Sequence, residues 1–241
     1  MTPGIFITGT NTGVGKTVVA AAWTRAIAMA GHRVVGLKPL ASGSARDAEG
    51  RLRNTDALAL LTAASVPLPY ELVNPYCFEP AIAPHLAAEE ARQVITADDL
   101  VAWYGKATAG AELAIVEGAG GWRVPLHPLG FLSDLPERLG LGVVVVVGLT
   151  LGCLNHARLT VEAIQQAGRS PFLGWIGNQV DPGFERLGAN LHSLERLLGG
   201  PPIALVPALG PNPDPDAAAG HLSGPIARSI VSRMLDAAAP A

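Results

Sequence analysis

Short apolar runs alternate along the chain with longer stretches in which apolar residues recur at helical spacing. The apolar runs predict strands at residues 5–7, 34–37, 113–116, 143–147, 172–176 and 203–206. The longer stretches predict helices at residues 17–30, 57–61, 84–92, 97–109, 133–139, 155–167, 185–198 and 222–235. Five consecutive valines fill the fourth apolar run, which is typical of a strand buried on both faces of a sheet.

The alternation of strands and helices predicts an α/β fold, with a doubly wound, mostly parallel sheet as the middle layer of a three-layer sandwich. The chain has 241 residues and no internal repeat or linker, so we expect one domain over 1–241, with a frayed tail at about 236–241. Turn-forming residues crowd segments 40–54 and 66–84, which are expected to be irregular. Asn155 and Gly168 are the expected caps of the helix between them.

The loop between the first strand and the first helix carries the most specific pattern. It reads Gly-Thr-Asn-Thr-Gly-Val-Gly-Lys-Thr over residues 9–17, which predicts a phosphate-binding loop (P-loop) and a fold of the P-loop NTPase type. We expect Lys16 to reach the β- and γ-phosphates and the Thr17 hydroxyl to bind Mg²⁺. Thr10 stands where the usual pattern has glycine, so the alternative is an ordinary glycine-rich turn.

Other polar residues follow the ends of predicted strands, where ligands gather in open parallel sheets. Glu117 suits a Mg²⁺-binding acid, and the alternative is a surface carboxylate. Lys38 suits a second cation beside phosphates, and the alternative is a solvated lysine. Asp56 either helps to hold Mg²⁺ or caps a helix. Asn178 and the loop after Pro207 complete this expected site.

Composition narrows the function classes. Hydrophobic residues make up 49% of the chain and charged residues 15%, which argues against a disordered protein. A net charge of -3 offers no basic footprint for nucleic acid. The apolar runs are too short to cross a membrane and no signal peptide is apparent. Cys77 and Cys153 lack metal-ligand spacing, so we expect free thiols and a cytoplasmic location. The histidines are expected to be surface or capping residues, namely His32, His85, His127, His156, His192 and His221.

Five motifs together resemble the dethiobiotin synthetase family. They lie at residues 9–17, 38–43, 54–56, 117–121 and 152–156, in the family's order, and span about four-fifths of the chain. The resemblance implies an enzyme of biotin biosynthesis that uses ATP and Mg²⁺ to close a ring on 7,8-diaminopelargonic acid with CO₂ or bicarbonate. The products are dethiobiotin, ADP and phosphate, and the reaction passes through a carbamate and a carbamic–phosphoric anhydride.

The resemblance also implies roles for individual residues. Lys16 and Lys38 are the catalytic residues, and Thr17, Asp56 and Glu117 are the metal ligands. Nucleotide contacts are implied for Gly13, Val14, Gly15, Lys16, Thr17, Val18, Asp56, Glu117, Gly118, Ala119, Gly120, Asn178, Gln179, Pro207, Ala208 and Leu209. Substrate contacts are implied for Thr12, Lys38, Ser42, Gly152, Cys153, Leu154 and Asn155.

The motif at 152–155 resembles a helix N-terminus that, in this family, holds the substrate carboxylate across a dimer interface, which implies a homodimer with shared sites. The sequence departs from the family at Gly13, where some members carry Glu, and at 210–213, where some carry an acid. Selectivity between ATP, CTP and GTP therefore stays open.

Two other functions compete with this interpretation. A regulatory or positioning P-loop ATPase with nucleotide-switched dimerisation often carries an additional lysine inside the loop, which residues 10–12 lack. A small-molecule kinase leaves Lys38 and the motif at 152–155 unexplained together. Tyr70, Tyr76 and Trp122 are expected to pack in the core rather than to contact substrate.

Overall fold

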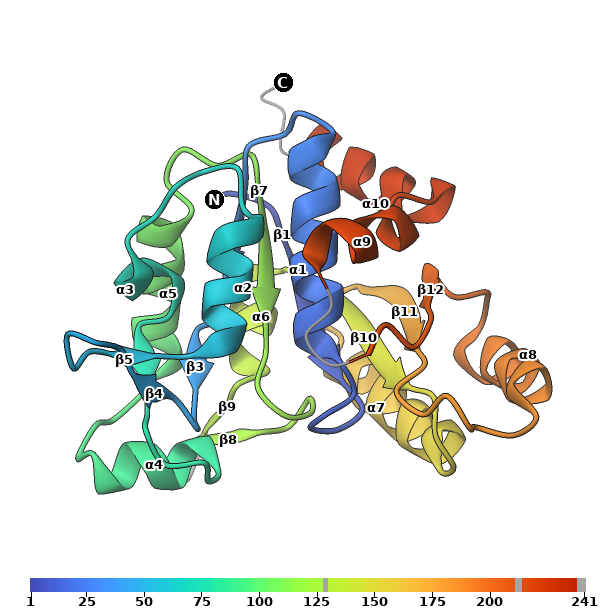
Figure 1. The fold of residues 1–241 in the computed structure, drawn as a ribbon, viewed down its shortest axis with the longest axis horizontal. Coiled ribbons are helices and arrows are strands. Elements are labelled where there is room, and N and C mark those ends of the chain that lie inside the picture. The colour runs from blue at the N-terminus through green and yellow to red at the C-terminus, as the bar shows by residue number, and fades with distance from the viewer. Residues whose placement is uncertain (128–129, 211–213, 238–241) are drawn as a thin grey trace.

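The computed structural model describes residues 1–127, 130–210 and 214–237. Within these residues the chain forms a six-stranded sheet in the order β12-β11-β10-β1-β7-β2, in which every neighbouring pair is parallel (Figure 1). Its strands are β1 (Gly4–Gly9), β2 (Val34–Leu37), β7 (Leu113–Glu117), β10 (Gly142–Gly148), β11 (Phe172–Asn178) and β12 (Ala204–Val206). All strands predicted from the apolar runs are confirmed.

Helices cover both faces of this sheet and confirm the three-layer sandwich. One face carries α1 (Lys16–Met29), α2 (Thr55–Ala63), α9 (Pro215–Ala219) and α10 (Pro225–Asp236). The other face carries α4 (Pro84–Glu90), α5 (Ala97–Ala107), α6 (Asp134–Leu139), α7 (Cys153–Ala167) and α8 (Leu187–Leu198).

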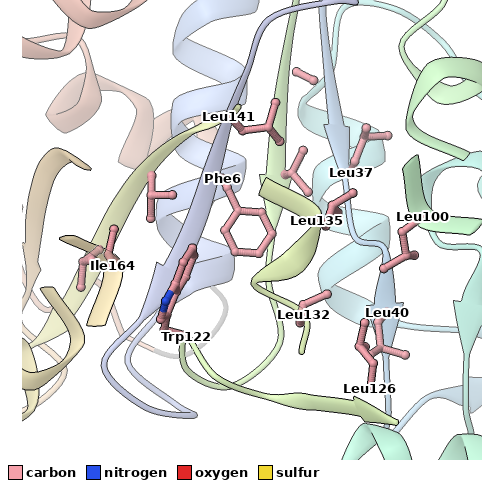
Figure 2. Packing of buried hydrophobic residues seen from close by; sticks show 14 of the residues in the cluster. Phe6, Leu37, Leu40, Leu100, Trp122, Leu126, Leu132, Leu135, Leu141 and Ile164 are labelled. Atoms are coloured by element: carbon pink, nitrogen blue, oxygen red, sulfur yellow. The ribbon is translucent and has the colours of Figure 1, made fainter. Parts of the chain in front are cut away.

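Two clusters of buried apolar side chains lie on the two faces, and residues of one strand alternate between them. Ile5 and Ile7 of β1 belong to the cluster under α1, whereas Phe6 belongs to the opposite cluster. Figure 2 shows Phe6 near Trp122, and their ring centroids lie 6.2 Å apart. The five valines of β10 also alternate between the clusters and are fully buried, as the sequence predicts.

The two segments expected to be irregular contain short regular elements. Residues 40–54 include β3 (Leu40–Ala41) and the antiparallel pair β4 (Ala45–Arg46) and β5 (Leu52–Arg53). Residues 66–84 include α3 (Tyr70–Val73) and β6 (Tyr76–Cys77), which pairs with β3. Strands β8 (Pro125–His127) and β9 (Gly130–Phe131) form a further pair. Two-residue strands carry too little periodicity to be predicted from a pattern.

Four predicted helix starts are wrong by two or three residues, at α2, α7, α8 and α10. Helix α7 begins at Cys153, and its N-cap is Gly152 in a left-handed conformation with φ of +96°, so Asn155 lies in the first turn instead of capping it. Gly168 does cap the other end. The last helix begins at Pro225 instead of residue 222, because a residue before proline disfavours the helical conformation and Gly224 is extended. Helix α9 and a 3₁₀ turn at Gly220–Leu222 precede it.

Some expectations fall on undescribed residues. Most of the expected frayed tail lies at 238–241, and most of the stretch that departs from the family pattern lies at 211–213, both outside the described residues. The single domain over 1–241 remains a prediction. In the described parts of the chain, no helix is both long and apolar enough to cross a membrane.

Candidate active site

The P-loop connects the end of β1 to the start of α1. Gly15 adopts a left-handed conformation with φ of +86° and caps α1, and Lys16 is the first helical residue. The Lys16 ammonium donates a hydrogen bond to the carbonyl of Asn11 at 3.0 Å, so the side chain folds back along the loop. Burial lowers the pKa of Lys16 to about 8, and the neighbouring Lys38 adds to this effect. An anion bound in the loop would therefore compensate a destabilised positive charge.

The sheet register brings Lys38 and Glu117 together. Leu37, the last residue of β2, pairs with Val116 of β7, so Lys38, which follows β2, and Glu117, which ends β7, lie at the same sheet edge. The Lys38 ammonium contacts Glu117 Oε1 at 2.6 Å and Asp56 Oδ2, from the first turn of α2, at 3.0 Å. The hydroxyl of Thr17 donates to the same Glu117 oxygen at 2.9 Å. Four chain segments thus meet at one point.

The charges of this cluster stabilise one another. Burial alone would lower the pKa of Lys38, but the carboxylates of Glu117 and Asp56 outweigh it and raise this pKa. Burial opposes the ionisation of Asp56, yet the Lys38 ammonium holds the Asp56 pKa below its usual value. Burial raises the pKa of Glu117, and Lys38 opposes that rise. Lys38 is therefore a buried cation held charged by two carboxylates.

A cavity of about 810 Å³ opens beside this cluster. Most residues predicted for phosphate, metal and substrate contacts lie in its wall. These are Thr12, Gly13, Gly15, Lys16, Thr17, Lys38, Ser42, Asp56, Glu117, Ala119 and Gly120. Gly118 lies directly behind, and its carbonyl accepts a hydrogen bond from Lys38 at 3.3 Å.

The oxygen atoms of the cluster fit Mg²⁺. Glu117 Oε2 is buried and has no hydrogen-bond partner among the described residues, which leaves one carboxylate oxygen for a further cation contact. Together with the Asp56 carboxylate and the Thr17 hydroxyl, it forms the hard oxygen set that Mg²⁺ prefers. The described residues hold no group of three His, Cys, Asp or Glu suited to a metal. A Mg²⁺ site completed by phosphates and water needs only one or two carboxylates.

A second cavity of about 420 Å³ also has Gly15 of the P-loop in its wall. Its wall contains Gly15 and further residues predicted to contact the nucleotide, which are Val18, Asn178, Gln179, Pro207, Ala208 and Leu209. Asn178 is buried, and its side-chain amide donates a hydrogen bond to the carbonyl of Val14 at 2.9 Å. This predicted nucleotide contact is thereby attached to the P-loop.

Comparisons with known proteins identify the family. A family model described as an AAA domain matches residues 3–213. The ATP-dependent dethiobiotin synthetase BioD of Cellvibrio japonicus is 46% identical over 217 residues, which cover 90% of this chain and 94% of the relative. The protein of the same name from Pseudomonas paraeruginosa is 49% identical over 221 residues, covering 91% and 96%. The chain belongs to the dethiobiotin synthetase family.

Solved structures agree with the P-loop NTPase fold. The MinD cell division protein of Aquifex aeolicus covers 99% of this chain and 99% of its own, with a TM-score of 0.55 and 16% identity. A ParA family ATPase from Chlorobium tepidum covers 98% and 99%, with a TM-score of 0.53 and 15% identity. At such identities the likeness shows the fold alone. The regulatory ATPase alternative is therefore less supported than the synthetase family.

One motif of the dethiobiotin synthetase family lies apart from both cavities. Among the described residues, neither cavity wall includes the start of α7, which comprises Gly152, Cys153, Leu154 and Asn155. Cys153 is buried, which raises the pKa of its thiol, and both Cys153 and Cys77 are free of disulfides. The predicted free thiols are confirmed, whereas the predicted substrate contacts at 152–155 are not brought to the Lys38 cavity within one chain.

The structure adds cavity residues that the sequence did not indicate. Residues 81–85 from the segment before and at the start of α4 form part of the large cavity, as do Val124 and Pro125. His85 is half-buried in this wall, whereas a surface or capping role was expected. No local signal marks these positions, because long-range packing brings them to the site. Trp122 and Tyr70 are buried as predicted, and Tyr76 is partly buried.

Proposed function

We propose that this protein is an ATP-dependent dethiobiotin synthetase. It would close the ureido ring on 7,8-diaminopelargonic acid with CO₂, at the expense of ATP. The observation that carries this proposal is the position of Lys38, a buried cation between two carboxylates and beside the P-loop lysine. This arrangement puts several positive groups where two anions must react.

The proposed reaction has three bond-forming steps. An amine of the substrate attacks CO₂ and loses a proton, which gives a carbamate. A carbamate oxygen attacks the γ-phosphorus of ATP, and ADP leaves, which gives a carbamic–phosphoric anhydride. The second amine attacks the carbonyl carbon, and phosphate leaves as the ring closes. The second step joins an anion to a polyanion, so it depends on positive charge in a partly dry site.

We assign the residues of the site separate roles in this step. Lys16 and the N–H groups of the P-loop bind the β- and γ-phosphates. Lys38 neutralises charge on the carbamate and on the transferring phosphoryl group. Thr17, Asp56 and Glu117 would hold Mg²⁺, which when bound supplies further positive charge to the phosphates.

The remaining predicted contacts follow from the two cavities. Thr12 and Ser42 in the large cavity wall would contact the diamine. The adenine ring would enter the second cavity, between Asn178 with Gln179 and the segment of Pro207, Ala208 and Leu209. The Gly118–Gly120 backbone would approach the nucleotide beside Glu117. Two free cysteines accord with the proposed cytoplasmic location.

Replacing Glu117 with glutamine tests the metal site without relying on turnover. The substitution removes one charge from the oxygen set, so we expect Mg²⁺ affinity in the presence of ADP to fall about tenfold or more. The measurement is the Mg²⁺-dependent rise in melting temperature with ADP present, backed by calorimetric titration of Mg²⁺. Glu90→Gln, at an exposed position of α4, is the matched control. An unchanged Mg²⁺ response in Glu117→Gln would remove Glu117 from the metal site.

We further propose a homodimer with shared sites. The start of α7 lies outside the Lys38 cavity and outside the second cavity of its own chain. A substrate whose carboxylate is bound there would therefore span two subunits. The N–H groups at the start of a helix suit such an anion. Beside this helix start, Leu151 is 95% exposed, and Leu159 of the same helix is 57% exposed. Exposed leucines beside the predicted carboxylate site support an interface at this surface.

Leu151→Asp tests the dimer. A charge at this exposed leucine would have to be desolvated at the interface, so we expect the protein to become largely monomeric and to lose most turnover at assay concentration. Sedimentation analysis and the rate at several protein concentrations measure both effects. Val94→Asp is the control, because Val94 is 75% exposed before α5, away from α7. A wild-type protein that is monomeric and fully active at assay concentration would refute the shared site.

Phosphate release tests the proposed reaction itself. It is measured with ATP and Mg²⁺, with and without 7,8-diaminopelargonic acid and bicarbonate, and the organic product is identified by mass. Release that needs both reactants, with a product heavier than the diamine by CO₂ less water, supports ring closure. Release that is indifferent to the diamine favours the regulatory ATPase instead, and a phosphorylated product that persists favours a kinase.

A further inference from the structure

A chain of buried hydrogen bonds lies behind the Lys38 cluster. Asn74, which is 2% exposed, follows α3 and donates a hydrogen bond to the backbone carbonyl of Lys38 at 2.7 Å. The N–H of Lys38 in turn donates to the carbonyl of Val73 at 2.9 Å. The backbone N–H and C=O of Lys38 are therefore both held by the end of α3. The Lys38 side chain, which has many rotamers, therefore starts from a backbone that these two bonds hold in place.

The same chain reaches the start of α2. The hydroxyl of Tyr70 donates to Asn74 Oδ1 at 3.0 Å and accepts from the N–H of Asn54 at 2.7 Å. Asn54 is the N-cap of α2, and its side chain accepts from the N–H groups of Asp56 and Ala57. One tyrosine hydroxyl thus joins the residue that holds Lys38 to the residue that begins the helix of Asp56.

We propose that Tyr70 and Asn74 are positioning residues for the ring-closing reaction. Neither Tyr70 nor Asn74 belongs to the described residues that line the large cavity. They would therefore act on the reaction through Lys38 and Asp56 rather than by touching the substrate. They hold the Lys38 backbone and the start of α2 at the separation that lets the Lys38 ammonium meet Asp56 at 3.0 Å. This inference rests on the proposed function, because it assigns Lys38 to catalysis.

The polar character of this pair argues against a role in packing alone. A buried hydroxyl and a buried amide cost free energy unless each is paired, and an apolar pair would fill the same space without that requirement. Apart from a 3.5 Å contact between the Tyr70 hydroxyl and Cys77 Sγ, the side-chain bonds of the pair end on backbone groups of Lys38, Asn54 or Tyr76, or on the other member. The bonds therefore fix where two site-bearing segments lie relative to each other.

Tyr70→Phe tests this role, with Tyr104→Phe as the matched control. Tyr104 is fully buried, and its hydroxyl donates to the carbonyl of Thr2 at 3.0 Å, beside the amino end of β1 and far from the cluster. We expect Tyr70→Phe to lower kcat about tenfold to a hundredfold, because small misplacement of a catalytic group is costly. KM for ATP should change little, because the P-loop is untouched. Tyr104→Phe should match the loss of melting temperature but keep kcat.

A second variant and a second readout keep the proposal testable. Asn74→Asp keeps an oxygen that accepts from Tyr70, but it replaces the Nδ2 donor with a second oxygen that faces the Lys38 carbonyl. We therefore expect kcat to fall in this variant as well. The chain has three lysines, Lys16, Lys38 and Lys106, so isotope-labelled lysine gives few side-chain signals to assign. Tyr70→Phe should shift the Lys38 signal and leave Lys106 unchanged, whereas Tyr104→Phe should shift neither.

The outcomes separate this inference from the proposed function. If Tyr70→Phe loses the same stability as Tyr104→Phe while kcat stays within about twofold, Tyr70 is a packing residue and the inference is wrong. An unshifted Lys38 signal overturns it equally. If the wild-type protein closes no ring, the proposed function fails, and the lysine signals alone then decide whether Tyr70 positions Lys38.

Discussion

Lys38→Gln is expected to lower kcat about a hundredfold to a thousandfold, the usual effect of removing a group that stabilises transition-state charge. Glutamine keeps a hydrogen-bond donor at this position but removes the positive charge between the carbamate and the phosphoryl group. Nucleotide affinity should be largely kept, because Lys16 and the P-loop backbone bind the phosphates. Steady-state kinetics gives kcat, and calorimetric titration of ADP with Mg²⁺ gives the affinity.

Stability is part of the same expectation. Lys38 is 4% exposed and pairs with Glu117 and Asp56, so its loss leaves two carboxylates facing each other. Breaking a buried pair from one side costs roughly 3–5 kcal/mol, so the melting temperature should fall. Nucleotide binding by the variant shows that it still folds. Lys106→Gln, at an exposed position, is the matched control and should change neither kcat nor the melting temperature. Full turnover in Lys38→Gln would contradict its catalytic role.

Gly15→Ala is expected to weaken nucleotide binding far more than Gly13→Ala. Both glycines have positive φ, +86° and +76°, so both substitutions carry a left-handed penalty of roughly 1–2 kcal/mol. A Cβ at Gly15 would lie 1.9 Å from Asn178 Nδ2, whereas a Cβ at Gly13 would meet nothing within 4 Å. Only Gly15→Ala therefore forces Asn178 away from the Val14 carbonyl and disturbs the loop and the second cavity together.

Calorimetric titration of ADP into both variants measures this difference. Because the backbone conformational penalty is shared, any additional loss in Gly15→Ala reports the clash with Asn178. The melting temperatures without nucleotide should follow the same order, since Asn178 ties β11 to the P-loop. Equal losses of affinity in the two variants would show that the attachment of Asn178 to the loop has no energetic consequence.

Local pattern was sufficient for the parts of this protein that short segments specify. Each strand of the sheet is an apolar run bounded by turn residues, and burial of such a run needs no knowledge of its neighbours. The P-loop could be predicted in the same way, because its glycines form a local turn and its Gly-Lys-Thr ending begins α1. The set of five motifs identified the family, which the sequence relatives bear out.

Helix starts were harder to predict, because several neighbouring residues are suited to the N-cap position. Asn155 has the chemistry of an N-cap, yet Gly152 takes the position through its left-handed conformation. At α2 the opposite holds, since Asn54 accepts both capping bonds and leaves the Asp56 carboxylate to Lys38. From the sequence alone, Asp56 could have been either a helix cap or a metal ligand.

The sequence by itself determined the strands of the six-stranded sheet, the phosphate loop and the charged residues of the Lys38 cluster, because each depends on a few neighbours in the chain. The tertiary structure alone decided that β7 lies between β1 and β2. This order brings Glu117 to Thr17 across 100 residues of sequence and to Lys38 across 79. It alone gave Tyr70 its place between Asn54 and Asn74. Such contacts depend on how helices pack on a sheet, and no local pattern carries that information.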